Sequence, residues 1–147
     1  MGQITLLLAD DEKVILDSFY RELKSDVLEV TLATTGEEAV NMINTNRFDI
    51  VVTDLLLPVV DGLQVLKAAK NKDVRTIVII LTGHGDVESA VDALRLGADD
   101  FLRKPCDPNE LLYRVSNCLA KQEMQRKNVV GESTLPICRK CKKILDH

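Results

Sequence analysis

Short apolar runs alternate along the chain with segments in which apolar residues recur every three or four positions. The apolar runs predict strands at residues 4–9, 28–33, 48–54, 75–82 and 98–103. The segments with the helical period predict helices at residues 13–24, 35–44, 61–70, 87–97 and 108–126. Strands that are almost continuously apolar belong to a sheet that is covered on both faces, and such sheets are parallel. The pattern therefore predicts five successive strand–helix units in an open, doubly wound α/β fold.

The residues at several predicted helix ends agree with these boundaries. Thr35 and Glu38 have the spacing of a capping box, in which each side chain bonds the backbone N–H of the other residue. Asp107 and Pro108 suit the start of the last helix, and Gly97 suits the end of the fourth. We expect the first helix to bury one face, formed by Val14, Leu16, Phe19, Tyr20 and Leu23.

The composition restricts the class of protein. The chain has 147 residues, of which 46% are hydrophobic and 29% charged, so one domain with a short appendage is expected. The formal net charge of −4 argues against nonspecific nucleic-acid binding, which needs clustered Lys and Arg. No apolar run approaches the roughly 18 residues of a membrane span, and no signal peptide is recognisable. We therefore expect a cytoplasmic protein that binds neither membranes nor nucleic acid.

Polar side chains gather where the predicted strands end. Asp10 and Asp11 follow the first strand, Asp54 ends the third, Thr82 ends the fourth, and Lys104 follows the fifth. The carboxyl ends of parallel strands meet at one edge of the sheet, which is where open α/β sheets bind ligands. The amino-terminal ends carry no comparable set of residues. The sequence therefore predicts a functional site at the carboxyl edge.

The residue types at this edge indicate phosphoryl transfer. Three carboxylates brought together require a cation, and ligands that are all oxygen favour Mg²⁺ or Mn²⁺. Asp54 can then act as a carboxylate nucleophile that forms an aspartyl phosphate. Lys104 would neutralise charge on the phosphoryl group, and Thr82 would donate a hydrogen bond to it. The Lys104–Pro105 peptide bond can adopt the cis form at low cost.

Four separated motifs carry a resemblance to a known family. They are ADD at residues 9–11, VVTDLLLPVVDG at 51–62, ILTGHGD at 80–86 and DDFLRKP at 99–105. Together they resemble, over residues 3–125, the receiver domain of response regulators in bacterial two-component systems. The resemblance implies a flavodoxin-like fold whose five parallel strands have the order 2-1-3-4-5, with helices on both faces. It also implies a signalling switch that accepts a phosphoryl group from a histidine kinase or a phosphotransfer protein.

The same resemblance implies a role for each residue that matches the family's motifs. Asp54 is the phosphoacceptor, and Asp10 and Asp11 form the acid pair that holds Mg²⁺ or Mn²⁺ with it. The backbone carbonyl of Leu56 supplies a further metal ligand. Apart from catalysing its own phosphorylation and dephosphorylation, such a domain is not an enzyme.

The resemblance further implies a conformational switch. Lys104 pairs with the phosphoryl group, and Thr82 and Phe101 are the switch residues that move towards it. The surface remodelled by this movement is formed by the fourth helix, the fifth strand and the fifth helix. Dimerisation through that surface on phosphorylation is a further hypothesis.

Residues 126–147 are expected to form a linker and a short basic tail, because helical periodicity fades after Arg126. Cys138 and Cys141 have a CxxC spacing, which together with His147 is an incomplete zinc site. The segment LPICRKCKKI resembles a cysteine-containing segment at the end of some bacterial sensor-kinase and regulator chains, in which more residues follow. We therefore expect a domain boundary at residue 125, followed by a tail that is flexible or truncated.

Two other functions remain as alternatives. A magnesium-dependent phosphohydrolase of the haloacid-dehalogenase kind also forms an aspartyl phosphate, but it needs an acid two residues after the nucleophile. Leu56 occupies that position here. The second alternative is a metal-binding or redox module centred on Cys138 and Cys141.

Overall fold

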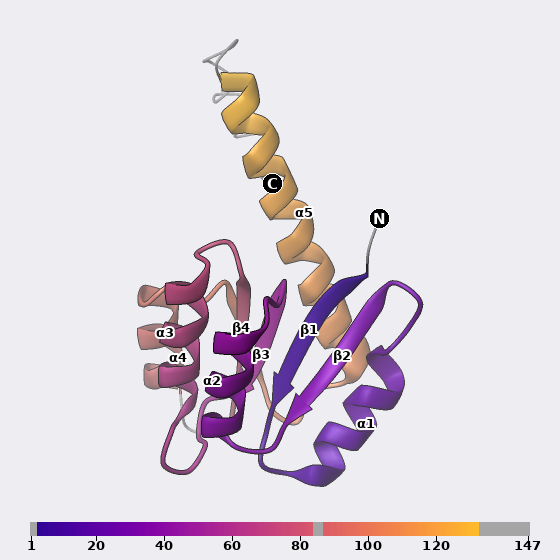
Figure 1. Ribbon diagram of the computed structural model, residues 1–147, viewed down its shortest axis with the longest axis vertical. Helices are drawn as coiled ribbons and strands as arrows, with labels where there is room; N and C mark the ends of the chain where they lie inside the picture. Colours follow the sequence, from indigo (N-terminus) through magenta and orange to yellow (C-terminus); the bar gives the residue numbers. More distant parts are fainter. Residues whose placement is uncertain (1–2, 84–86, 133–147) are drawn as a thin grey trace. The chain divides into compact units, whose positions relative to one another are not determined.

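The computed structural model describes residues 3–83 and 87–132, in which five strands alternate with five helices (Figure 1). In chain order the elements are β1 (Ile4–Ala9), α1 (Lys13–Leu23), β2 (Leu28–Ala33), α2 (Gly36–Thr45), β3 (Ile50–Asp54), α3 (Gly62–Lys72), β4 (Ile77–Thr82), α4 (Val87–Arg95), β5 (Asp100–Arg103) and α5 (Pro108–Glu132). The strands form one sheet in the order β2-β1-β3-β4-β5, and every neighbouring pair is parallel. The predicted fold class and strand order are confirmed.

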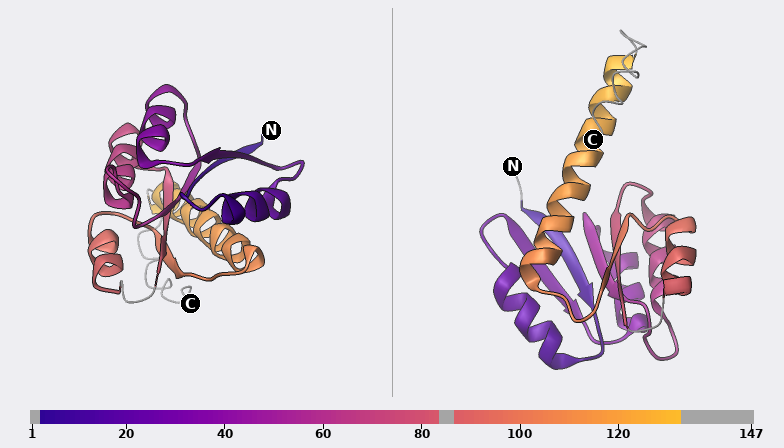
Figure 2. Two further views of the ribbon diagram at one scale, coloured as in Figure 1. Left: turned by 90° about the horizontal axis from the view of Figure 1, so that it is seen from below. Right: turned by 180° about the vertical axis from the view of Figure 1, so that it is seen from behind.

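Helices cover both faces of the sheet, as the apolar strands predict. On one face lie α2, α3 and α4, and on the other lie α1 and the first turns of α5 (Figures 1 and 2). Every residue of β3 and β4 is buried, because both faces of these inner strands are covered. Each fully buried aliphatic side chain contributes roughly 1.5–3 kcal/mol relative to exposure, so this aliphatic core supplies the main stabilisation.

The buried face of α1 is narrower than the sequence predicts. Leu16, Phe19 and Leu23 are buried as expected, but Val14 is 81% exposed and Tyr20 is 37% exposed. Their assignment to the buried face was wrong for a geometric reason. Val14 lies two residues before Leu16, which is about 200° around the helix and therefore on the opposite side. Tyr20 lies at the margin of the buried stripe.

Only half of the predicted capping box forms at the start of α2. The hydroxyl of Thr35 accepts a hydrogen bond from the Glu38 N–H at 3.0 Å. The Glu38 carboxylate, however, accepts from the N–H and the hydroxyl of Thr34, at 2.8 and 3.1 Å. A complete capping box, which the sequence analysis missed, joins Asp61 and Gln64 at the start of α3.

The last helix is longer than predicted. Helix α5 ends at Glu132 rather than at the predicted residue 126, and the interpretation of residues 126–147 as a linker and tail stays a prediction. Residues 127–132 have the sequence KNVVGE, in which Asn, Val and Gly have low helix propensity, so local propensity does not explain the extension. Residues through Val115 form one compact unit and the chain from Ser116 a second, and the predicted boundary at residue 125 stays a prediction. Cys138, Cys141 and His147 lie outside the described residues.

No helix in the described part of the chain combines the length and the apolar character that a membrane crossing needs.

Candidate functional site

The predicted site residues meet at the carboxyl edge of the parallel sheet, the edge towards which β1 and β2 point in Figure 1. Asp10 follows β1, Asp54 and Thr82 are the last residues of β3 and β4, and Lys104 follows β5. The Lys104 N–H donates to the carbonyl oxygen of Thr82 at 2.7 Å, which continues the β4–β5 pairing and fixes where the lysine leaves the sheet. The Lys104–Pro105 bond is cis.

Three carboxylates form a compact cluster at this edge. One oxygen atom from each of Asp10, Asp11 and Asp54 lies within 4.8 Å of the others. Asp10 is fully buried and Asp54 is 6% exposed, whereas Asp11 faces solvent. Within the described residues this is the only group of three or more acidic, His or Cys side chains that could hold a metal ion. All of its side-chain donors are oxygens, which suits Mg²⁺ or Mn²⁺ better than zinc.

The ammonium group of Lys104 lies between the two buried acids. Its Nζ is 3.1 Å from Asp10 Oδ2 and 3.1 Å from Asp54 Oδ2. A third carboxylate, that of Glu12, lies 3.5 Å from the same nitrogen. The sequence analysis missed Glu12, although its place directly after the acid pair could have suggested it. One cation is thus shared by two buried acids and one exposed acid.

Burial and this shared cation set the pKa values of the central pair. Burial raises the pKa of Asp54, and the hydrogen bond and charge of Lys104 oppose this effect without cancelling it. Burial lowers the pKa of Lys104, but Asp10 and Asp54 outweigh it, so the pKa of the lysine is raised and its charge is retained. The ionised form of Asp54 is therefore costly at this buried position, and a further cation beside it would offset that cost.

The remaining predicted residues lie around this pair. Thr82 is buried, and its hydroxyl donates a long hydrogen bond, 3.5 Å, to the Gly83 carbonyl. The Leu56 N–H donates to Asp54 Oδ1 at 3.3 Å, while the Leu56 side chain is 61% exposed. Phe101 is partly buried and packs against the main core cluster.

The loop between β3 and α3 is held tightly against the rest of the fold. Leu57 is buried, and Val60 packs against the core. A Cβ atom on Gly36 would overlap the carbonyl oxygen of Val60, and one on Gly62 would overlap that of Asp54. Only glycine permits such close backbone approaches. The backbone on both sides of the loop is therefore fixed.

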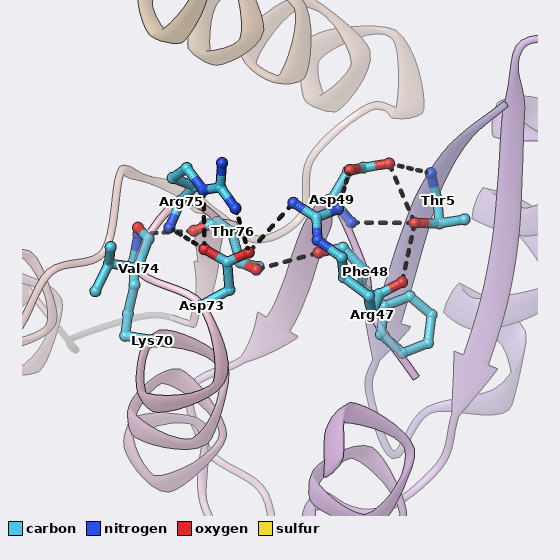
Figure 3. A network of polar contacts seen from close by, with 9 residues as sticks. All are labelled: Thr5, Arg47, Phe48, Asp49, Lys70, Asp73, Val74, Arg75 and Thr76. Carbon is cyan, nitrogen blue, oxygen red and sulfur yellow. Dashed lines mark hydrogen bonds and ion pairs between the residues drawn. The ribbon is translucent and has the colours of Figure 1, made fainter. Parts of the chain in front are cut away.

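The amino-terminal edge of the sheet carries a separate polar network, shown in Figure 3. Arg47 bridges Asp49 and Asp73 at 2.7 and 3.3 Å, and Asp49 also accepts hydrogen bonds from Thr5. Hydrogen bonds from Arg75 lower the pKa of Asp73 to about 2. The expectation that this edge carries nothing comparable was wrong for charged residues. It differs from the carboxyl edge because its acids are spread out and paired with arginines.

Comparison with known proteins identifies the family. Residues 6–116 match the response regulator receiver domain family. Response regulator SaeR of Staphylococcus aureus strain USA300 is 35% identical over 118 residues, which cover 80% of this chain and 51% of SaeR. The chain thus spans about half the length of the curated relatives that it matches.

Solved structures agree with this match. A CheY-like receiver domain protein from Methanospirillum hungatei JF-1 has a TM-score of 0.79 at 31% identity, covering 84% of this chain and 99% of its own. The BeF3-activated DrrB receiver domain has a TM-score of 0.73 at 33% identity, covering 80% of this chain and 98% of its own. Sequence and fold therefore point to one family, and the phosphohydrolase alternative is set aside. The chain belongs to the response regulator receiver domain family, and it is a two-component signalling protein rather than an enzyme.

Proposed function

We propose that this chain is a phosphorylation-dependent switch in which Asp54 accepts a phosphoryl group from a histidine kinase or a phosphotransfer protein. The observation that carries the proposal is the cluster of Asp10, Asp11 and Asp54 at one sheet edge, with Lys104 between its two buried members. A carboxylate nucleophile, oxygen ligands for a divalent cation and a fixed ammonium group are the parts that phosphoryl transfer requires.

Each residue has a separate part in the transfer. A carboxylate oxygen of Asp54 attacks phosphorus as the bond to the donor's histidine nitrogen breaks, and the bonding electron pair stays on the imidazole. Lys104, already 3.1 Å from Asp54 Oδ2, is placed to pair with a phosphoryl oxygen. The Thr82 hydroxyl, whose hydrogen bond to the Gly83 carbonyl is long at 3.5 Å, can turn to donate to another phosphoryl oxygen.

Asp10, Asp11, Asp54 and the backbone carbonyl of Leu56 would hold a divalent cation, Mg²⁺ or Mn²⁺. When bound, this ion supplies positive charge to the transferring phosphoryl group. The residues fit such an ion, because the three side chains offer only oxygen ligands and the ionised form of Asp54 is otherwise disfavoured by burial.

We expect Mg²⁺ to raise the unfolding temperature of the wild type and to have a much smaller effect on Asp11→Ala. Asp11 is exposed, so its removal should cost the ion a ligand without disturbing the core. At ten times the dissociation constant the ion would stabilise the wild type by about 1.4 kcal/mol. Thermal unfolding with and without Mg²⁺ measures this, with Asp17→Ala as the control because Asp17 is also exposed. If Mg²⁺ raised the unfolding temperature of Asp11→Ala as much as that of the wild type, Asp11 would not be a ligand of the metal ion.

Phosphorylation would then act on a surface beside the site. Thr82 and Phe101 are the proposed switch residues, and the affected face is formed by α4, β5 and the first turns of α5. The exposed apolar residues of α4 and of the first turns of α5 include Val91, Leu94, Leu112 and Tyr113. We include dimerisation through this face in the proposal, and unchanged mass by light scattering with beryllofluoride would count against it.

A cytoplasmic location and an output through protein rather than nucleic-acid contacts belong to the same proposal, in keeping with the net charge of −4.

Acetyl phosphate with Mg²⁺ tests the function. We expect intact-mass spectrometry to show one phosphoryl group per wild-type chain, none on Asp54→Ala, and none when the divalent cation is removed with EDTA. Labelling that stops at one group per chain is the behaviour of a switch. Continued release of phosphate from a phosphomonoester, or labelling of Asp54→Ala, would contradict the proposal.

A further inference from the structure

A groove runs between helices α2 and α3, which lie side by side on one face of the sheet (Figures 1 and 2). It has a volume of about 450 Å³. Its floor is apolar and half-buried, whereas its walls are polar and exposed. The floor consists of Val40, Val60 and Ala68, and the walls consist of Glu37, Asn41, Gln64, Lys67 and Asn71. We call these eight residues the α2–α3 groove.

Contacts at both ends hold the two helices at a fixed separation. Where the helices begin, Gly36 lies so close to the Val60 carbonyl that a Cβ atom would overlap it. Where they end, Lys72 Nζ donates to the carbonyl oxygens of Ile43 and Asn44 at 3.1 and 2.9 Å, which joins the last turn of α3 to the last turn of α2. The groove is therefore formed before any ligand binds, and this lowers the cost of binding.

The walls carry polar groups that the described part of the chain does not use. The side chains of Glu37, Asn41, Lys67 and Asn71 make no hydrogen bond or ion pair with another described residue. Gln64 Oε1 accepts a backbone hydrogen bond in the capping box of α3, but the side-chain NH₂ group of Gln64 has no partner among the described residues. Three of the five wall residues are carboxamides, which offer both a donor and an acceptor, as a peptide group does.

An extended peptide matches this groove better than a helix or a small molecule. The backbone groups of a helix are bonded within the helix, whereas an extended segment leaves its N–H and C=O groups free for the carboxamides. A small molecule would remain largely in contact with water, because five of the eight lining residues are exposed. From Gln64 to Asn71 the groove follows α3 for about 10 Å, the length of about three extended residues.

The two charges of the groove lie at different depths. Glu37 is the second residue of α2 and Lys67 is the sixth residue of α3, so the two are about 6 Å apart along the helices, or about two extended residues. A basic residue beside Glu37 and an acidic residue two positions further on would therefore pair with both charges. Because successive side chains of an extended segment point to opposite sides, the residue between them would face the apolar floor.

We propose that the α2–α3 groove binds an extended segment of a partner protein, in which a basic, a small apolar and an acidic residue follow one another. The backbone of the segment bonds to the carboxamides of Asn41, Gln64 and Asn71, and its central side chain packs on the floor. None of the groove residues belongs to α4, β5 or α5. The inference is therefore separate from the proposed output surface, and it does not depend on phosphoryl transfer to Asp54.

A phage library of random heptapeptides supplies the probe. The library is selected on the full-length wild type after depletion on Ala68→Arg, whose long side chain fills the groove. We expect the enriched peptides to share the basic–apolar–acidic order. A synthetic copy of the most enriched peptide should shift the side-chain amide NMR signals of Asn41, Gln64 and Asn71 and leave that of Asn44 unchanged.

Matched variants test the contacts one at a time. Asn41→Ala and Asn71→Ala should each weaken binding of this peptide about fivefold, as for the loss of one hydrogen bond. Asn44→Ala makes the same exchange on α2 outside the groove, and it should bind like the wild type. Lys67→Glu should also weaken binding about fivefold, and a peptide whose acidic residue is replaced by lysine should restore it. All four residues are exposed, so these variants should fold normally.

The inference is overturned by any of three results. The first is a selection that enriches no peptide on the wild type. The second is a peptide that binds but leaves the amide signals of the groove unchanged, or that loses as much affinity with Asn44→Ala as with Asn41→Ala. The third is self-association of the wild type in light scattering that Ala68→Arg prevents, because the occupant would then be a second copy of this chain.

Discussion

Asp54→Asn should take up no phosphoryl group, and without Mg²⁺ it should unfold at a higher temperature than the wild type at neutral pH. An amide is not a nucleophile, so the loss of labelling should be complete. The gain in stability follows from burial, which disfavours the ionised carboxylate more strongly than Lys104 favours it. Lys104 keeps Asp10 and Glu12 as partners in the variant.

The dependence of this gain on pH has a definite sign. The pKa of Asp54 is raised in the folded state above its unfolded value of about 3.9. Protonation of Asp54 therefore stabilises the folded state fully below the unfolded pKa, and this stabilisation is lost as pH rises through the folded pKa. The variant's advantage should grow over that interval and disappear towards pH 4. Thermal unfolding in EDTA across this range measures it, and added Mg²⁺ should stabilise only the wild type.

Asp49→Asn is the matched control, with the same substitution at the opposite edge of the sheet. Burial alone would raise the pKa of Asp49, but hydrogen bonds from Thr5 and Arg47 outweigh burial and lower it. The ionised form is therefore favoured, and Asp49→Asn should be less stable than the wild type at neutral pH. Its deficit should shrink as pH falls. If Asp54→Asn were also less stable at neutral pH in EDTA, our account of the pocket's electrostatics would be wrong.

Gly36→Ala should destabilise the fold by about 2–3 kcal/mol, although alanine is the better helix former. Helix propensity alone predicts a gain of at most about 1 kcal/mol for this exchange. The added Cβ, however, would overlap the carbonyl group of Val60, which is backbone, and a Cβ has no rotamer by which it could avoid the contact. The loop that links β3 to α3 would have to shift, which is the larger effect.

Urea denaturation measures this loss, and Glu37→Ala is its control. Glu37 is the next residue of α2 and is exposed, so its replacement should change the stability by no more than about 0.5 kcal/mol. Labelling of Gly36→Ala by acetyl phosphate should also be slower, because Val60 belongs to the loop that follows Asp54. If Gly36→Ala were as stable as the wild type, the β3–α3 loop would be able to shift at a lower cost than its contacts indicate.

The strands and the site are predictable from sequence because their signals are local and redundant. A buried parallel strand has to be apolar along its whole length, so β1 and β4 are recognised without knowledge of their neighbours. Parallel pairing then brings the residues after each strand to one edge, and Asp10, Asp54 and Lys104 meet there as expected.

Other features depend on contacts that no local pattern records. Glu38 bonds to Thr34 instead of Thr35, a choice between two neighbouring donors that spacing cannot decide. Arg47 reaches Asp73 across the sheet edge only because β3 and β4 are adjacent. The positive φ of Val59 is contrary to valine's own preference and is imposed by the fixed backbone on both sides of the β3–α3 loop.

The span of sequence between the site residues has a consequence for biosynthesis. Lys104 bonds to Asp10 and Asp54 across 94 and 50 residues, and it follows β5, the last strand in the sequence. A nascent chain that has left the ribosome only as far as β4 holds all three acids but lacks the lysine. If the proposed function holds, competence to receive a phosphoryl group arises only once β5 and Lys104 are in place, and partly synthesised copies would not compete with finished ones for the donor.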